Sequence, residues 1–189
     1  MGSHVKSRAF TAALTFLLSA WTLSSAAAQE APEGRGDTVF FGLNVGMGAA
    51  QISQPGFSRD FRPGLQYDAV CGFGLTRHWA AGLELSTWQP FNIDGNPSHL
   101  HLFAWRLEYT FGPQDGLVAA TSLGLGLGDG SQSKRIGSGG VLQLGWRWPI
   151  ARLVTLTAEA GAHGVAFTDG TVFSPFVALQ LRFYGRSGL

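Results

Sequence analysis

Residues 103–111, Phe-Ala-Trp-Arg-Leu-Glu-Tyr-Thr-Phe, decide the fold. Every second residue in this stretch is aromatic or large and apolar, and the residues between them are small, polar or charged. A period of two is that of a β-strand, in which successive side chains point to opposite faces of the sheet. The stretch therefore predicts a strand with one apolar face and one polar face.

Seven more segments show the same alternation, and each has about ten residues or slightly more, the length that a tilted strand needs to cross a bilayer. After residue 28 no segment has the pattern of an amphipathic helix longer than a few turns. An even number of strands also brings both chain ends to the same side. The sequence predicts an all-β fold, an eight-stranded antiparallel up-and-down transmembrane β-barrel, with strands at residues 38–51, 64–76, 79–88, 99–111, 116–128, 136–148, 153–164 and 172–184.

The connections between these strands alternate in length. Short turns at one end of a barrel and longer loops at the other are typical of outer-membrane proteins. We expect tight turns at residues 76–78, 112–115 and 149–152, and longer polar loops at residues 51–63, 89–98, 129–135 and 165–171.

The first 28 residues have the pattern of a secretory signal peptide. Lys6 and Arg8 precede an apolar stretch at residues 9–23, and the three alanines at 26–28 offer a cleavage site. A membrane-anchoring helix is disfavoured, because the apolar stretch is short and interrupted by Thr and Ser. We expect a cleaved signal peptide at residues 1–28, a short N-terminal segment at 29–37, the barrel at 38–184 and a C-terminal tail at 185–189.

Composition excludes several other classes of protein. The chain carries 13 basic and 12 acidic side chains, so no nucleic-acid surface is expected. Its 27 glycines without a Gly-X-Y period exclude collagen, and its 14 Phe and 6 Trp argue against a disordered tail. Cys71 is the only cysteine, so no intrachain disulfide can form, and we interpret its thiol as a small hydrophobe.

The strand faces opposite the apolar ones carry Gly, Ala, Ser and Thr with a few ionisable groups. This composition suits the crowded interior of an eight-stranded barrel, where each buried charge needs a partner. We expect these charges to form a structural network that plugs the lumen, and the alternative is a charged constriction in a conducting pore. The predicted network consists of Asp68, Glu84, Arg106, Glu108, Arg147, Glu159 and Arg182.

Aromatic residues gather at the strand ends next to the predicted short turns and the chain ends. Amphipathic aromatic side chains prefer the membrane interface, whereas a soluble barrel would scatter them along its strands. We therefore expect the short-turn end to be periplasmic, with both termini there. The predicted aromatic girdle consists of Phe41, Phe73, Trp79, Tyr109, Phe111, Trp146, Trp148 and Phe183, with Phe40 and Tyr184 beside them.

The strand pattern, the loop lengths and the closing segment at residues 177–183, Val-Ala-Leu-Gln-Leu-Arg-Phe, resemble the small outer-membrane β-barrel family that includes the OmpA transmembrane domain and OmpX-like proteins. The resemblance covers residues 38–184. It implies the barrel architecture and insertion by the outer-membrane assembly machinery, which reads an aromatic-ended last strand. The family's closing strand usually ends the chain at Phe, whereas residues 184–189 follow here. The family is functionally mixed, so the resemblance implies no activity.

Histidines are the main candidates for chemistry. Some small outer-membrane barrels modify lipid A, and residues 160–165 are the segment nearest to the His-bearing strand of the 3-O-deacylase type. Gly stands where the nucleophile would be, so we interpret His163 and Glu159 as interior polar residues rather than a base and its orienting partner. His99 and His101 have a spacing that can seat a metal. No third ligand is evident, and we interpret both as part of a solvated rim.

We therefore expect a non-enzymatic integral outer-membrane barrel with a structural, adhesive or envelope-stabilising role through its extracellular loops. The first alternative is a narrow pore or small-ligand channel, and the second is a lipid A-modifying hydrolase. The expected partners are outer-membrane lipids, lipopolysaccharide phosphates near Lys134 and Arg135, and the assembly machinery at the C-terminal strand. We expect a monomer with no cofactor.

Overall fold

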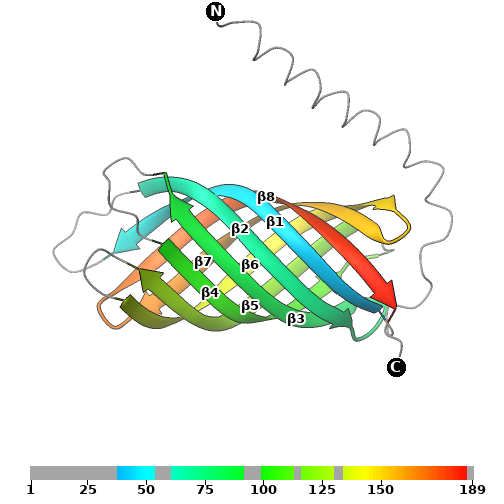
Figure 1. The fold of residues 1–189 in the computed structure, drawn as a ribbon, viewed down its shortest axis with the longest axis horizontal. Coiled ribbons are helices and arrows are strands. Elements are labelled where there is room, and N and C mark those ends of the chain that lie inside the picture. The colour runs from blue at the N-terminus through cyan, green and yellow to red at the C-terminus, as the bar shows by residue number, and fades with distance from the viewer. Residues whose placement is uncertain (1–37, 54–60, 92–98, 113–115, 130–133, 187–189) are drawn as a thin grey trace, which may run out of the picture.

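The computed structural model describes residues 38–53, 61–91, 99–112, 116–129 and 134–186. Each strand pairs antiparallel with the next, and the last pairs with the first, so the sheet closes into a barrel (Figure 1). The predicted eight-stranded up-and-down barrel is confirmed. The strands are β1 (Thr38–Ser53), β2 (Phe61–Gly74), β3 (Trp79–Pro90), β4 (His99–Thr110), β5 (Gly116–Asp129), β6 (Lys134–Ala151), β7 (Val154–Phe167) and β8 (Gly170–Arg186).

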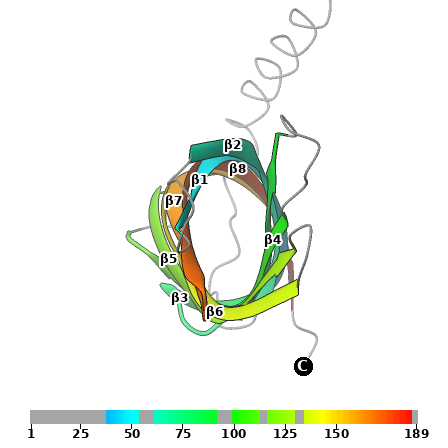
Figure 2. The same cartoon turned by 90° about the vertical axis from the view of Figure 1, so that its left-hand side faces the viewer.

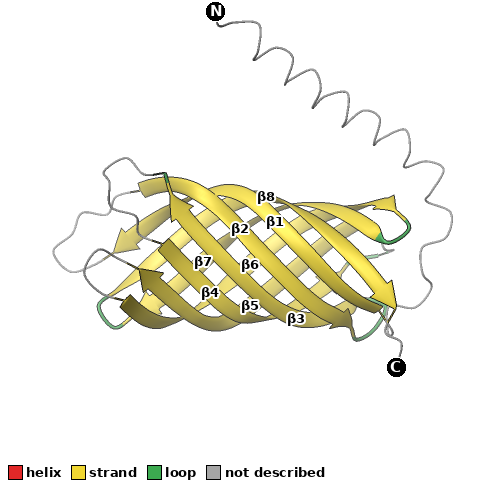
Figure 3. Cartoon of the chain, viewed as in Figure 1, coloured by secondary structure: helices red, strands yellow, loops and turns green. Residues whose placement is uncertain are grey.

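The strands cross the barrel obliquely and form a ring when the barrel is viewed from its end (Figure 2). Thr38 pairs with Arg186, so the first and last strand positions lie at the end that also holds the β2–β3, β4–β5 and β6–β7 turns. Figure 3 shows the described residues as strands joined by loops and turns. No helix within the described ranges is long and apolar enough to cross a membrane.

Two predicted connections differ from the structure. The tight turn expected at residues 149–152 lies at residues 152–153, because β6 continues to Ala151, which pairs with Val154. Residues 165–171 were expected to form a longer polar loop, but Phe167 pairs with Gly170 and only Thr168 and Asp169 connect β7 to β8. The pairing continues because Val165 and Val172 are buried and extend the inward apolar face of both strands beyond the expected ends. The predicted signal peptide, residues 1–28, lies outside the described residues.

The two faces of each strand differ as the sequence predicts. The outward face carries large apolar side chains that are open to the surroundings, such as Trp105 at 71% and Leu123 at 70% exposure. The side chains between them, including Ala104, Arg106 and Ser122, are buried inside the barrel. The apolar surface of this protein therefore faces outward, which is the reverse of a water-soluble barrel.

Glycine lets neighbouring strands approach closely at Gly124 of β5. A Cβ atom built there would lie 2.5 Å from the Cα atom of Ala104 on β4, closer than real Cβ atoms come to backbone. The inward face of β5 therefore leaves room for the neighbouring strand and contributes little volume to the lumen.

Candidate functional site

Glu108 on β4 lies at the centre of a buried charge network near the short-turn end of the barrel. Arg182 on β8 donates to both of its carboxylate oxygens, with Nη1–Oε1 and Nη2–Oε2 distances of 2.8 and 2.6 Å. Arg147 on β6 donates to Oε1, and Arg106 on β4 lies 3.3 Å from Oε2 through Nη2. One carboxylate thus holds three arginines from three strands, and each of these side chains is at most 2% exposed.

Arg106 links this centre to a second carboxylate, Glu84 on β3. Its Nη1 atom lies 3.0 Å from Glu84 Oε2 and 2.5 Å from the side-chain oxygen of Gln143 on β6. Gln143 and Ser122 also donate to Glu84. The ion pairs therefore connect strands on different sides of the barrel and hold them together through the lumen.

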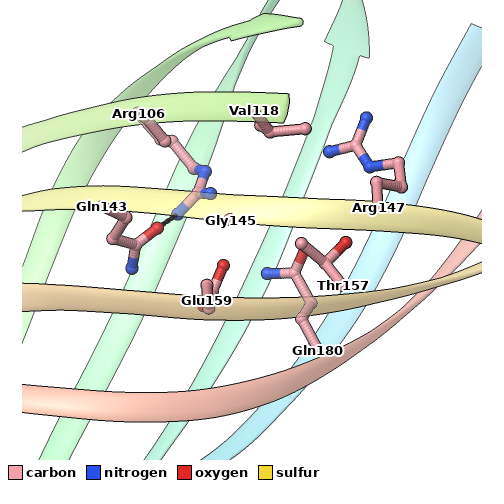
Figure 4. A pocket seen from close by; sticks show the side chains of 9 residues that line it. Arg106, Val118, Gln143, Gly145, Arg147, Thr157, Glu159 and Gln180 are labelled. Atoms are coloured by element: carbon pink, nitrogen blue, oxygen red, sulfur yellow. Dashed lines mark hydrogen bonds between the residues drawn. The ribbon is translucent and has the colours of Figure 1, made fainter. Parts of the chain in front are cut away.

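A pocket with about 190 Å³ of space not filled by protein atoms lies among these side chains. Figure 4 shows Arg106 and Gln143 pointing toward one another across it, with Arg147, Glu159 and Gln180 around it. The gaps between the described side chains that line it are too narrow for a water molecule.

The structure places all seven residues of the predicted network inside the barrel. It brings five of them into one set of ion pairs, namely Glu84, Arg106, Glu108, Arg147 and Arg182. Asp68 and Glu159 make no ion pair with any residue in the described ranges. They accept instead from amides: Gln66 Nε2 donates to Asp68 Oδ2 at 2.9 Å, and Asn44 Nδ2 donates to Glu159 Oε1.

Sequence reasoning missed the buried amides and hydroxyls that complete this network. The alternation of each strand places these side chains on the inward faces, and this pattern could have predicted them. The missed residues are Asn44, Gln66, Ser86, Ser122, Gln143 and Gln180.

Sequence reasoning also missed an apolar layer inside the barrel toward the loop end. Its members are buried, and several of them adjoin the connections opposite the short turns, where an inward polar face was expected. We call this layer the apolar cap, and it consists of Ala50, Trp88, Leu100, Leu102, Ala104, Val141, Val165, Val172, Phe176 and Ala178. The lumen therefore holds a charged layer toward the short turns and an apolar layer toward the loops.

The eight residues of the predicted girdle lie at the short-turn end on the outward side. Trp79, Tyr109 and Phe111 contact one another there, with ring centroids 4.8 and 4.7 Å apart. Phe40 and Tyr184 differ from the prediction. Phe40 alternates with Phe41 and is buried inside the barrel, where it packs against Tyr184 and lies 4.4 Å from the Arg182 guanidinium.

His163 on β7 lies inside the barrel beside the charge network. Its Nε2 atom is 2.8 Å from Gln66 Nε2 and 3.3 Å from the Ser86 hydroxyl, and its ring packs edge-on against Phe176. The serine that the sequence did not place next to His163 therefore comes from β3. Both side chains are 1% exposed, so a lipid substrate has no access to them in this conformation.

Other sequence candidates lie outside the charge network. His99 and His101 stack on the outward face of β4, and His101 Nδ1 lies 3.0 Å from the Thr87 hydroxyl. No group of three metal-ligating side chains occurs among the described residues. Arg135 pairs with Asp169 at 3.2 Å, and Cys71 is exposed on the outer face of β2 with a free thiol.

No protein-family model matches the sequence, and no curated protein matches it significantly. Solved structures similar in fold include two outer-membrane proteins. Neisserial surface protein A has a TM-score of 0.59 and 16% identity, over 79% of this chain and 97% of that chain. Ail, the attachment invasion locus protein of Yersinia pestis, has a TM-score of 0.54 and 10% identity, over 76% of this chain and 98% of that chain. The chain thus has the fold of small eight-stranded outer-membrane barrels, as its sequence predicts.

Proposed function

We propose that this protein is an integral outer-membrane barrel that acts through its outer surface while side chains keep its lumen closed. The observation that carries the proposal is the inverted arrangement of its faces. Large apolar side chains cover the outside, and a network of arginines and carboxylates fills the inside. Such a surface is stable against lipid hydrocarbon and aggregates in water.

Two features support a closed lumen. The three arginines around Glu108 cross the barrel near the short turns, and the apolar cap fills it toward the loops. A hydrated ion would have to displace both layers, and burial of charge without a partner is costly. We therefore favour a structural, adhesive or envelope-stabilising role over conduction.

Orientation, export and assembly belong to the same proposal. We infer that the short-turn end is periplasmic, because short turns face the periplasm in this architecture, and the girdle residues would lie at that membrane interface. Residues 1–28 would direct export, and the assembly machinery would engage the end of β8. The opposite end would meet lipopolysaccharide and, in an adhesive role, a host surface.

Cell fractionation and gel migration test the proposal together. The protein is expected in the outer-membrane fraction, and the unheated sample is expected to migrate differently from the boiled one because the closed barrel resists detergent. A protein recovered in the soluble periplasm, or one whose migration ignores heating, would overturn the proposal.

The same purified protein distinguishes the alternative functions. In planar bilayers we expect no discrete conductance steps, and reproducible steps would favour the pore. His163 and Ser86 lie 3.3 Å apart, which is the one observation that favours a lipid-modifying hydrolase. Mass spectra of lipid A are expected to be the same with and without expression, and a lost acyl chain would establish the enzyme.

A further inference from the structure

The buried charges are unevenly divided along the lumen. Toward the short turns, Glu108 faces both Arg147 and Arg182, so this end has more positive than negative charge. Arg106 joins the two ends. Farther from the short turns lie three more buried carboxyl groups, Asp68, Glu84 and Glu159. Within the described residues Glu84 alone of these forms an ion pair, with Arg106. Two carboxyl groups at this end therefore lack a compensating guanidinium.

The amides beside these carboxyl groups have a defined orientation. Gln66 Nε2 has two hydrogens and lies 2.9 Å from Asp68 Oδ2 and 2.8 Å from His163 Nε2. Asn44 Nδ2 donates to Glu159 Oε1. Reversing either amide would place its oxygen against a carboxylate oxygen, and two acceptors cannot bond. The amide oxygens of Asn44 and Gln66 must therefore point elsewhere.

Three of the buried oxygens without a hydrogen-bond partner among the described residues belong to amide or carboxyl groups near one another on β1 and β2. They are Asn44 Oδ1, Gln66 Oε1 and Asp68 Oδ1, and their side chains are 2%, 0% and 4% exposed. Asn44 lies directly opposite Asp68 in the β1–β2 pairing, which places the two Cβ atoms about 4.5–5.5 Å apart. Gln66 lies two residues from Asp68 on the same inward face.

The surrounding donors do not satisfy all three oxygens. Ser86 interacts with Asp68, but its hydroxyl has one hydrogen and cannot also serve the amide oxygen of Asn44 or Gln66. Leaving a buried acceptor unpaired is energetically unfavourable. Three neighbouring acceptors beside uncompensated carboxylates point to a ligand that is positively charged.

We propose that Asn44, Gln66 and Asp68 bind one small hard cation of the Na⁺ or Ca²⁺ class inside the barrel. Carboxylate and amide oxygens are the ligands that such cations prefer, and bound water completes their coordination. Glu84 and Glu159 supply the surrounding negative charge. The apolar cap separates the site from the loop end, so the ion enters during folding and exchanges slowly. The inference rests on the proposed function in one respect, since it requires a closed lumen.

Metal content and thermal stability test the site on the whole protein. The protein is purified from membranes in detergent, unfolded with chelator present, and refolded in choline, sodium or calcium chloride at equal ionic strength. We expect sodium or calcium to raise the unfolding midpoint by roughly 5–10 °C above choline when the ion is far above its dissociation constant. If calcium is the ion, about one equivalent per barrel is expected to survive gel filtration. Sensitivity to sodium alone assigns the monovalent ion.

Matched variants locate the effect. Asp68→Asn keeps the shape of the side chain and removes its charge, and we expect it to abolish the difference between cation and choline. Asp169→Asn removes a carboxylate that is half exposed on the outside and is expected to keep the full difference. If Asp68→Asn does not fold, Gln66→Met removes an acceptor oxygen at similar volume and is expected to reduce the difference.

Equal midpoints of the unmodified protein in choline, sodium and calcium, with no retained metal, would overturn the inference. Buried water or a proton on Asp68 would then satisfy the oxygens. The same result would leave heat-dependent gel migration unchanged, so failure of the cation site is distinguishable from failure of the barrel.

Discussion

Replacing Glu108 by Gln is the sharpest perturbation of the buried network. The change keeps the size of the side chain and removes the negative charge that three arginines share. Arg106 retains Glu84 at 3.0 Å, and Arg182 retains Gln180 at 2.8 Å together with the Phe40 ring. Arg147 loses its one ion-pair partner among the described residues and stays 1% exposed. Because breaking a buried ion pair costs about 3–5 kcal/mol, we expect Glu108→Gln to lower the free energy of unfolding by about that amount.

Urea unfolding of the protein in lipid vesicles, followed by tryptophan fluorescence, measures this loss. The matched control is Asp169→Asn, which breaks the partly exposed pair with Arg135 and is expected to cost about 0–1 kcal/mol. Adding Arg147→Met to Glu108→Gln removes the uncompensated guanidinium and is expected to restore part of the stability. A loss below about 1 kcal/mol for Glu108→Gln, or no recovery in the double variant, would refute the reasoning that the network holds the strands together.

Further variants test the other layers of the barrel. Leu123→Arg places a charge on the outward face of β5 and is expected to cost about 2–4 kcal/mol in vesicles. Thr171→Arg, exposed next to the β7–β8 turn, is expected to cost about 0–1 kcal/mol, and equal costs would contradict a lipid-facing wall. Leu102→Ala empties part of the apolar cap and is expected to cost about 2–5 kcal/mol in the same unfolding assay. A loss well below this range would contradict a dry, packed cap. Gly124→Ala brings a Cβ atom against the β4 backbone and is expected to cost about 1–3 kcal/mol. In the control Gly164→Ala, the added Cβ meets no described atom within 4 Å, and the stability is expected to be nearly unchanged. Similar values for both variants would show that the spacing between strands adapts freely.

The fold was predictable from the sequence because strand alternation is a local property. Residues 103–111 give the faces of β4 directly, and the same parity correctly places Arg106 and Glu108 inside. The alternation also predicts that Phe40 and Phe41, which are adjacent, point to opposite faces. Both were nevertheless assigned to the girdle because they lie near a strand end. A residue's distance from a strand end predicts its position along the barrel axis. Its place in the alternation predicts whether it points inward or outward.

Pairing inside the lumen was less predictable, because it depends on strands that are far apart in sequence. Glu108 meets Arg182, 74 residues away, only after the barrel closes with its particular tilt. Nothing local separates Asp68, which ends beside amides, from Glu84, which meets Arg106. The apolar cap was missed for a related reason. Leu100 and Leu102 alternate with His99 and His101, so the apolar face of this stretch is the inward one, the reverse of residues 103–111.

Cysteine reactivity along β5 tests the closed lumen and the lipid-facing wall in one measurement. Single cysteines replace residues 119–125 in a Cys71→Ser background, and each variant in vesicles is treated with a small charged thiol reagent or with one that partitions into lipid. We expect the outward positions, such as Leu123 and Leu125, to react with the lipid-soluble reagent alone, and the inward positions, such as Ala120 and Ser122, to react with neither. Rapid reaction of the inward positions with the charged reagent would show a water-filled lumen and contradict the closed barrel.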